Sequence, residues 1–369
     1  MAFIYYFTVF ITIALSLLAD RRVLSKENNE QSSLTIERND STARSRKILV
    51  IILASYLIFV GGFRYFTGVD YGFYYNTVKT TFDTLSSHIG LFKEPGIHFV
   101  SAVGRLFYNN GIVVILLSEI ITVVLYVRGI YKYSPLFSVS MILYLLMGEW
   151  TGTFNGIRQY LAAAIVFAGH RYIYDKKFFR YLLVVFIASL FHVTAWIMII
   201  PYFFYNKKPG LKQVFFLAIG TAIITYSYDF IFNIIGSYKG VEMSISDNSY
   251  YNTSVNVLRI GVAIIPVIVF FAFCKKDNLT HDEGFYINGL LFNAFAVIAA
   301  SGSAYLARVG IYTAPIALIG YGYLFKLFRN QRIVKVIILI TFLLFLVYWW
   351  FLVKDLGYKW WFNRSQYDF

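Results

Sequence analysis

Long apolar runs separated by short polar segments dominate the chain. A helix needs about 20 apolar residues to cross a hydrocarbon core about 30 Å thick, and ten runs approach or reach that length. The first run lacks the basic start and the small-residue cleavage site of a signal peptide, so we interpret it as a span. We predict transmembrane helices near residues 2–19, 48–63, 111–129, 136–149, 156–174, 213–234, 257–274, 284–302, 308–326 and 336–353.

This pattern predicts an all-α polytopic membrane protein with about 10 transmembrane helices, in a single integral membrane domain over residues 1–369. The composition agrees, with 59% hydrophobic residues, 14% charged residues and a mean hydropathy of +0.63. A net charge of +14 would favour nucleic acid binding in a soluble protein, but most Lys and Arg lie between spans here, so we expect no nucleic acid partner. The one cysteine, Cys274, excludes an internal disulfide and a cysteine-based metal cluster.

The distribution of Lys and Arg predicts the orientation of the spans, because cytoplasmic loops are enriched in these residues. Residues 20–47 are polar and carry seven of them, so we predict a cytoplasmic loop that is mostly disordered, and an amino terminus on the outer side. The segments that then fall on the outer side are a long loop with an interfacial helix at 64–110 and a second loop at 235–256.

One segment breaks this alternation of sides. "DKKFFR" (175–180) and "NKKPGLK" (206–212) are both basic, although about 25 mainly apolar residues separate them. We therefore predict a re-entrant hairpin of two short helices over residues 175–212, with its apex at "ASLFH" toward the outer face. Non-helical backbone at such depth is tolerated only where protein or a water-filled cavity surrounds it.

An arginine, Arg158, follows small polar residues at the outer start of a predicted helix. Free backbone N–H groups and the helix dipole favour an anion there, and a guanidinium adds a forked donor for phosphate oxygens. Asn155 and Gln159 make the surroundings polar. We therefore predict an anion site, against two alternatives: snorkelling of the side chain to the interface, or an ion pair with Glu149.

Two further arginines occupy comparable outer positions. Arg308 opens a span after "SGSAYLA", so the same argument predicts an anion site or an anchor. Arg64 closes the second span and is either a third anion ligand or an anchor at the interface. Three arginines that converge on one outer vestibule would form a strong pyrophosphate site.

Three ionisable residues on the same side are candidates for a general base. His192 lies in the apolar hairpin, where an ionisable residue is a functional candidate; the alternative is a buried neutral imidazole bonded to a neighbouring helix. Asp70 and Glu94 flank the long outer loop, and either could accept a proton from a sugar hydroxyl or be solvated.

The outer loop is also rich in aromatic residues, in the stretch "YFTGVDYGFYY". Apolar faces of sugar rings pack on aromatic rings, so Tyr71, Tyr74 and Tyr75 are candidates for sugar binding. The alternative is the aromatic belt that Tyr and Trp form at any membrane interface.

Motifs of other site types are absent from the sequence. There is no Walker loop, no HExxH, no GxSxG and no set of Cys and His at metal-ligand spacing. We therefore expect no metal and no cofactor, and a donor substrate carried by lipid rather than by a nucleotide.

The sequence resembles the EpsG-type branch of the Wzy-like polysaccharide polymerases. The segments that carry the resemblance are "FRYFTGVDYGFYY" (63–75), "EPGIHFVS" (94–101), "NGIRQYLAAAI" (155–165), "ASLFHVTAWIMIIP" (188–201) and "ARVGIY" (307–312). Such polymerases join lipid-linked oligosaccharide repeat units during O-antigen, capsule or exopolysaccharide synthesis. Their logic is similar to that of GT-C-type lipid-dependent glycosyltransferases, which implies a comparable architecture.

The resemblance implies a glycosyltransferase in the bacterial cytoplasmic (inner) membrane, with its active site facing the periplasm or cell exterior. Donor and acceptor would both be undecaprenyl-pyrophosphate-linked oligosaccharides, and a chain-length regulator and a flippase of the same pathway are implied partners. Arg158 and Arg308, with Arg64 in addition and with Asn155 and Gln159 beside Arg158, are predicted to bind pyrophosphate. Asp70, Glu94 and His192 compete for the role of general base; we prefer Asp70, a choice that does not come from the resemblance.

Two other functions remain open. A flippase for lipid-linked sugars should distribute its charges through the membrane depth and show related halves. Here the unusual polar residues gather at one face and no halves match, which favours an enzyme. A glycan ligase at the outer face would differ only in its acceptor.

Overall fold

The computed structural model describes residues 3–27, 35–89, 93–227, 257–274, 279–300, 306–328 and 332–366, and the regular elements in these ranges are helices. The α-helices are α1 (Phe3–Glu27), α2 (Thr35–Gly62), α3 (Tyr71–Asn76), α4 (Phe82–Leu85), α5 (Gly96–Arg105), α6 (Ile112–Tyr133), α7 (Phe137–Leu146), α8 (Glu149–Gly152), α9 (Ile157–Ala168), α10 (Arg171–Tyr174), α11 (Phe178–Ser189), α12 (Leu211–Tyr226), α14 (Val257–Phe273), α15 (His281–Ala299), α16 (Ala307–Leu327) and α17 (Arg332–Val353). The 3₁₀ segments are η1 (Thr77–Lys79), η2 (Ser86–His88), η3 (Val193–Phe203) and η7 (Trp361–Gln366). The predicted all-α fold is confirmed for these ranges.

Four of the described helices are long and apolar enough to cross a membrane, at Phe3–Asp20, Ala43–Gly62, Ile112–Tyr133 and Lys335–Val353. Together with several shorter apolar helices they indicate a multi-pass membrane protein. A helix lies at each of the ten predicted spans. However, α7 and α9 have only 10 and 12 residues, which is about 15–18 Å of helix. A crossing by each of the ten therefore stays a prediction.

The polar connector at residues 20–47 is more regular than predicted. α1 continues to Glu27 and α2 begins at Thr35, so both ends of the segment are helical rather than disordered. Lys, Arg and Glu are good helix formers, which favours helix at these ends of the segment. Residues 28–34 lie outside the described residues, as does the predicted outer loop at 235–256.

The segment predicted as a hairpin contains two short helices, α11 and η3, that pack against each other. They have 12 and 11 residues, well short of the about 20 that a full crossing takes. The turn between them ends at His192, the residue before η3. Re-entry of this pair into the membrane stays a prediction.

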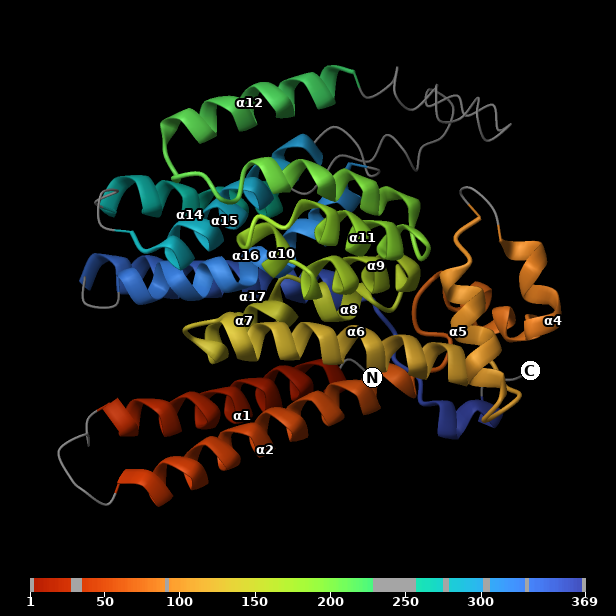
Figure 1. Ribbon diagram of the computed structural model, residues 1–369. Coiled ribbons are helices and arrows are strands. Elements are labelled where there is room, and N and C mark those ends of the chain that lie inside the picture. The colour runs from red at the N-terminus through yellow and green to blue at the C-terminus, as the bar shows by residue number, and fades with distance from the viewer. Residues whose placement is uncertain are drawn as a thin grey trace.

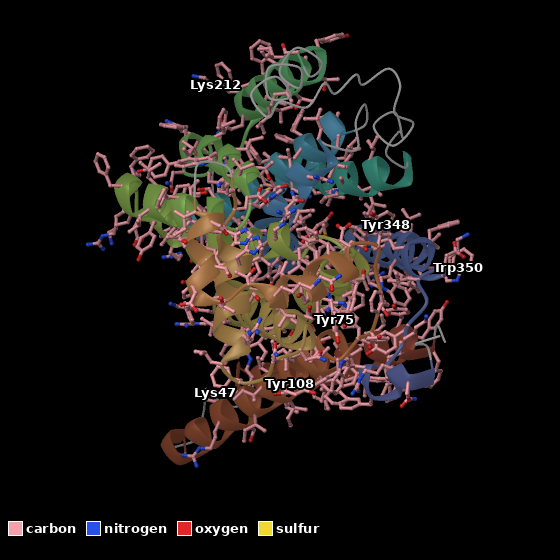
Figure 2. All side chains as sticks on the ribbon, turned by 90° about the vertical axis from the view of Figure 1, so that its right-hand side faces the viewer. Lys47, Tyr75, Tyr108, Lys212, Tyr348 and Trp350 are labelled. Atoms are coloured by element: carbon pink, nitrogen blue, oxygen red, sulfur yellow. The ribbon has the colours of Figure 1, made fainter. Side chains whose placement is uncertain are left out.

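The helices are arranged around α9. In Figure 1, α1 and α2 form an antiparallel pair along one side of the molecule, with α6 beside them, and α12 lies along the opposite side. α9 packs against α6, α11, η3 and α16, so its first turn meets several elements. α4 and α5 lie at one end of the molecule, near the carboxyl terminus (Figure 1). Seen from that end, Tyr75 lies near the middle of the face and Tyr348 toward one side (Figure 2).

Residues 358–366, which we name the C-terminal strap, pair with the chain that leaves α2. The Tyr65 backbone N–H donates to the Lys359 carbonyl at 2.9 Å, and the Trp361 N–H donates to the Phe63 carbonyl at 2.9 Å. An isolated bridge joins the two segments between these bonds. The strap thereby holds the first residues of the long outer loop in an extended conformation.

Arg64 lies between these bonds and its side chain points into the protein. It is fully buried, its Nη1 lies 3.4 Å from the Glu119 carboxylate, and its Nη2 donates to the Thr153 carbonyl at 3.2 Å. The guanidinium also stacks over the Phe154 ring, 4.4 Å from its centroid. Arg64 thus ties the outer loop to α6 and to the turn that precedes α9.

From the buried ion pair we predict how substitutions of Arg64 and Glu119 change the free energy of unfolding. Replacing Arg64 alone by Met should lower the free energy of unfolding by about 3 kcal/mol, because Glu119 then remains buried without its partner. Replacing Glu119 by Leu in the same chain should recover most of the loss, since no charge stays buried. Thermal unfolding in detergent measures this, with the partly exposed Arg105→Met as control. Equal midpoints for the wild type and Arg64→Met would contradict it.

Candidate functional site

Arg158 lies in the first turn of α9 and forms an ion pair with Glu94. Its Nη1 is 2.6 Å from Glu94 Oε2, and 31% of its side chain is exposed. The guanidinium lies over two rings of the outer loop, 5.2 Å from the centroid of Phe73 and 6.0 Å from that of Tyr74. Its Nε is buried and has no hydrogen-bond partner among the described residues. An ion pair with Glu149 was one alternative predicted for Arg158. The structure shows an ion pair with Glu94 instead.

Glu94 is the centre of a cluster of three ionisable residues, named here the Glu94 cluster: Glu94, Arg158 and His192. Its second oxygen, Oε1, lies 2.8 Å from His192 Nδ1 and accepts the Val193 backbone N–H at 3.0 Å. The carboxyl group is nearly buried, with 8% of its side chain exposed. Two of the predicted bases and the predicted anion ligand thus meet at one carboxylate.

The backbone around Glu94 is strained in a way that fixes this geometry. Glu94 has a φ of +51°, in the left-handed region that non-glycine residues rarely adopt and that costs about 1 kcal/mol. Two residues on, the Gly96 N–H donates to the Leu190 carbonyl at 2.8 Å. A Cβ at Gly96 would lie 2.7 Å from the Phe191 ring, so only glycine allows this approach. The strained residue and the close packing together hold Glu94 against His192.

The environment of Glu94 sets its protonation state. Burial raises the pKa of the carboxyl group, but the hydrogen bonds from His192 and from the Val193 N–H and the charge of Arg158 together hold the pKa below its ordinary value. Glu94 is therefore a carboxylate at neutral pH and accepts from His192 Nδ1. That bond leaves His192 Nε2 as the proton acceptor. The geometry favours His192 as the base and Glu94 as the group that orients it.

This pKa shift makes the stability depend on pH. The folded-state pKa of Glu94 lies below the ordinary 4.5, so the stabilisation is complete above that value and is lost as the pH falls through the folded-state pKa. We expect Glu94→Gln to be less stable than the wild type by about 2 kcal/mol near pH 7, with the difference shrinking as the pH falls below 4.5. Unfolding midpoints across this range measure it, with the exposed Asp70→Asn as control. A difference that does not change with pH would contradict the prediction.

Two further residues near the cluster were not singled out from the sequence, although the segments that carried the resemblance contain both. Tyr312 of α16 shares a hydrogen bond with Thr194, two residues after His192, at 3.0 Å between the hydroxyl oxygens. His98 of α5 bonds the Thr80 hydroxyl at 2.9 Å. Burial, together with the neighbouring charges of His88 and Arg158, lowers the pKa of His98. Their positions four residues after Arg308 and Glu94, respectively, were the signal available in the sequence.

Arg308 lines a polar cavity beside the start of α9. The cavity measures about 270 Å³, and Asn155 and Glu149 also line it. Gln159 Nε2 donates to the Arg308 backbone carbonyl at 3.0 Å, which joins the starts of α9 and α16. Asn155 Oδ1 accepts the Val69 N–H at 2.6 Å. Gln159 and Asn155 therefore hold backbone in place around the predicted arginines.

The other predicted residues lie apart from the cluster. Arg64 is enclosed by protein, as described above, so we do not include it in the site. Asp70 is exposed at the start of α3, and its side chain makes no capping hydrogen bond. Preference among the three candidate bases therefore moves from Asp70 to His192, because the Glu94 carboxylate, itself paired with Arg158, orients the His192 ring.

The tyrosines predicted to bind sugar are mostly inside the outer loop. Tyr71 is fully buried and donates to the Arg64 carbonyl at 3.0 Å, and Tyr74 is buried beside Arg158. Tyr75 donates to Asn110 at 2.8 Å. The exposed rings of this stretch are Phe66 and Phe73, which are the surfaces that a sugar ring could reach.

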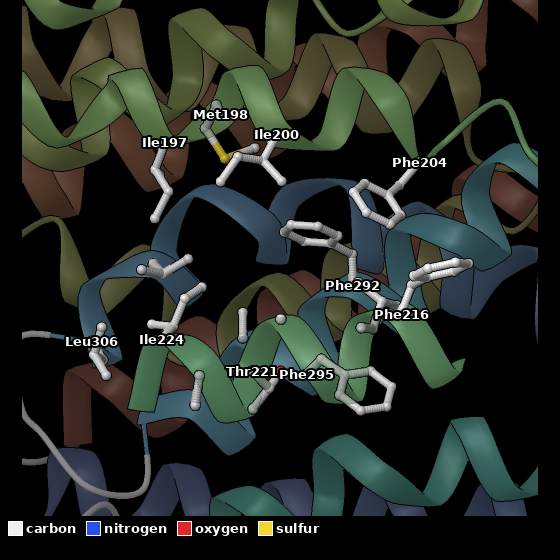
Figure 3. A pocket seen from close by; sticks show the side chains of 15 residues that line it. Ile197, Met198, Ile200, Phe204, Phe216, Thr221, Ile224, Phe292, Phe295 and Leu306 are labelled. Carbon is white, nitrogen blue, oxygen red and sulfur yellow. The ribbon is translucent and has the colours of Figure 1, made fainter. Parts of the chain in front are cut away.

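A second cavity has a different chemistry. It measures about 100 Å³ and lies between η3, α12, α15 and the start of α16, with apolar side chains such as Met198, Phe216 and Phe292 around it (Figure 3). Thr221 is its polar member. Among the described residues, no three His, Cys, Asp or Glu side chains are grouped as a metal site would require. Candidate chemistry in the described chain is therefore concentrated in the Glu94 cluster and the adjoining polar cavity.

Comparison with known proteins agrees with the resemblance found in the motifs. Residues 47–367 match the sequence profile of the EpsG family. No curated protein and no solved structure matches the chain, so the GT-C-like architecture stays a prediction. The matched range contains the Glu94 cluster, Arg308 and the C-terminal strap, and it covers most of the chain. The protein therefore belongs to the EpsG family, which is associated with exopolysaccharide biosynthesis.

Proposed function

We propose that this protein is a polysaccharide polymerase that joins undecaprenyl-pyrophosphate-linked repeat units at the outer face of the cytoplasmic membrane. The observation that carries the proposal is the Glu94 cluster, in which a forked cation and an oriented imidazole meet at a buried carboxylate. Family membership and the apolar helices support a membrane role in exopolysaccharide synthesis. The reaction class follows from what these side chains offer to a lipid-linked sugar.

Arg158 is suited to the leaving group of that reaction. When the bond between the anomeric carbon and the pyrophosphate breaks, negative charge develops on the pyrophosphate oxygen, and fixed cationic donors stabilise it. Nη1 of Arg158 is engaged by Glu94, whereas 31% of the side chain stays exposed and can reach a ligand. The rings of Phe73 and Tyr74 hold the guanidinium plane in one orientation.

His192 is suited to the incoming hydroxyl. Its Nδ1 is fixed on Glu94, so its Nε2 takes the proton of the acceptor hydroxyl as the hydroxyl oxygen attacks the donor's anomeric carbon. The new glycosidic bond forms, the bond to pyrophosphate breaks, and undecaprenyl pyrophosphate leaves. Glu94 stabilises the imidazolium that results, because its carboxylate already accepts from the ring.

Reconstitution tests the proposal directly. Purified protein in liposomes receives a lipid-linked repeat unit extracted from cells that lack the protein, and the products are separated on a gel. A ladder of glycans spaced by one repeat unit is expected. Cells that lack the protein should accumulate single-repeat glycan at the outer face. Failure of the pure protein to form any ladder would overturn the polymerase proposal. Accumulation on the inner face would indicate a flippase, and a single transfer to another acceptor would indicate a ligase.

A further inference from the structure

The polar cavity beside the Glu94 cluster contains groups that the mechanism above does not use. Glu149 is the first residue of α8 and is nearly buried, and Tyr126 donates to its carboxylate at 3.4 Å. The same cavity is lined by Thr151, Tyr160 and Arg308. An acidic residue, a basic residue and hydroxyl-bearing residues thus line a single space of about 270 Å³.

We propose that this cavity binds the terminal sugar of the acceptor repeat unit, a neutral, hydroxyl-rich ligand. The inference rests on the proposed polymerase function and adds the position of its second substrate. Sugar hydroxyls both donate and accept, so they suit a cavity in which Glu149 accepts and Arg308 donates. A pyrophosphate in the same space would meet the Glu149 carboxylate, and like charges repel.

The size and walls of the cavity fit this ligand class. Its volume of about 270 Å³ is close to the lower end of small-molecule sites, about 300 Å³, and far above the about 30 Å³ of one water. Tyr348 and Leu352 of α17 and Ile311 of α16 supply apolar wall opposite the polar groups. Apolar wall combined with a few convergent polar groups is a usual form of a small-molecule site.

The cavity also lies where an acceptor must lie. Asn155 lines it, and Arg158, three residues later in the same turn of chain, belongs to the Glu94 cluster. The bond from Gln159 to the Arg308 carbonyl keeps the two sides of this turn together. An acceptor sugar in the cavity and a donor pyrophosphate at Arg158 would therefore approach each other across the start of α9.

The shape of the cavity depends on Gly148, which turns the chain from α7 into α8. Its φ is +79°, a conformation that favours glycine, and a Cβ there would lie 2.5 Å from a methyl group of Leu352. Leu352 is 41% exposed while it lines the cavity, so it offers access from the surface. The adjacent Phe351 is similarly exposed, at 47%, and is not part of the lining.

These two neighbours allow a matched test. Cys274 is the one cysteine of the chain, so Cys274→Ser gives a background in which Leu352→Cys or Phe351→Cys is modified with a benzyl thiosulfonate. The benzyl group should lower the elongation rate at least about tenfold in Leu352→Cys and leave Phe351→Cys unchanged. Leu356→Cys, which also lines the cavity, serves as a second variant if Leu352→Cys does not fold.

A binding measurement separates this inference from the polymerase proposal. Free repeat-unit oligosaccharide, released from its lipid by mild acid, should slow modification of Leu352→Cys by about threefold or more and should not protect Phe351→Cys. Absence of protection, or full elongation by the benzylated Leu352→Cys enzyme, would overturn the inference. Failure of the unmodified wild type to elongate would instead overturn the polymerase proposal.

Discussion

Replacing Arg158 by Ala is expected to lower the rate of glycan elongation by about a hundredfold to a thousandfold. The reason is the loss of the forked cation that would stabilise the pyrophosphate as it leaves, in a site where Glu94 would then remain without its closest cationic partner. Lys at the same position keeps the charge but not the planar fork that stacks over Phe73. The elongation rate of Arg158→Lys should therefore lie between those of the wild type and Arg158→Ala. The glycan ladder of the reconstituted protein measures all three rates.

The control for this prediction is a second arginine outside the Glu94 cluster. Arg105 is partly exposed on α5 and donates to the Val78 carbonyl at 3.1 Å, away from the three members of the Glu94 cluster. Arg105→Ala should elongate at close to the wild-type rate. A full ladder from Arg158→Ala would remove the assignment of the leaving-group site, whatever the result for the control.

Replacing His192 by Ala should lower the elongation rate by about a hundredfold to ten-thousandfold, the range that a general base contributes. Since the lost group is an imidazole beside the Glu94 carboxylate, added free imidazole should restore part of the rate to His192→Ala. The same addition should not restore Arg158→Ala. Initial rates with and without imidazole measure the effect.

A second histidine provides the comparison for this variant. His98 lies on α5, four residues after Glu94, and bonds Thr80 rather than the carboxylate. His98→Gln should therefore elongate within a few-fold of the wild type and should not respond to imidazole. Loss of activity in His98→Gln that imidazole restores, with His192→Ala unaffected, would assign the base to His98 instead.

The fold was predictable from the sequence to the level of its helices. Lipid requires apolar side chains and an internally bonded backbone, so run length alone indicated an all-helical membrane protein. Run length did not show that α7 and α9 have only 10 and 12 residues, because the predicted spans extended to residues 149 and 174, past the turns at Met147 and Gly169. Those breaks depend on tertiary packing rather than on hydropathy.

The residues of the site were predictable from the sequence, but the contacts between them were not. Glu94 lies 64 residues before Arg158 and 98 before His192, so no helical or strand period relates them. They meet because Gly96 packs against Phe191, a contact that depends on two distant segments. The preference for Asp70 could rest only on its place in the outer loop, because the contact between Glu94 and His192 has no signal in the sequence.

Arg64 shows why the neighbouring residues in sequence were not sufficient to predict which arginines belong to the site. In sequence it resembles Arg158, since both lie at a predicted helix end among aromatic residues. What separates them is Glu119, which is 55 residues away in α6 and draws Arg64 into the interior. A single Glu in an apolar run is the available signal, because a buried carboxylate requires a partner.

The C-terminal strap has a consequence for the order of events on the ribosome. Tyr358 donates to the Val60 carbonyl across 298 residues, beside the strap's pairing with the start of the outer loop. At about 5–20 residues per second, that partner is synthesised about 15–60 s after the loop. The start of the loop that carries Phe73 and Tyr74 therefore gains these contacts only after the strap has been synthesised. Final packing of the loop start is thus a late step, separated from synthesis of the loop itself by most of the chain.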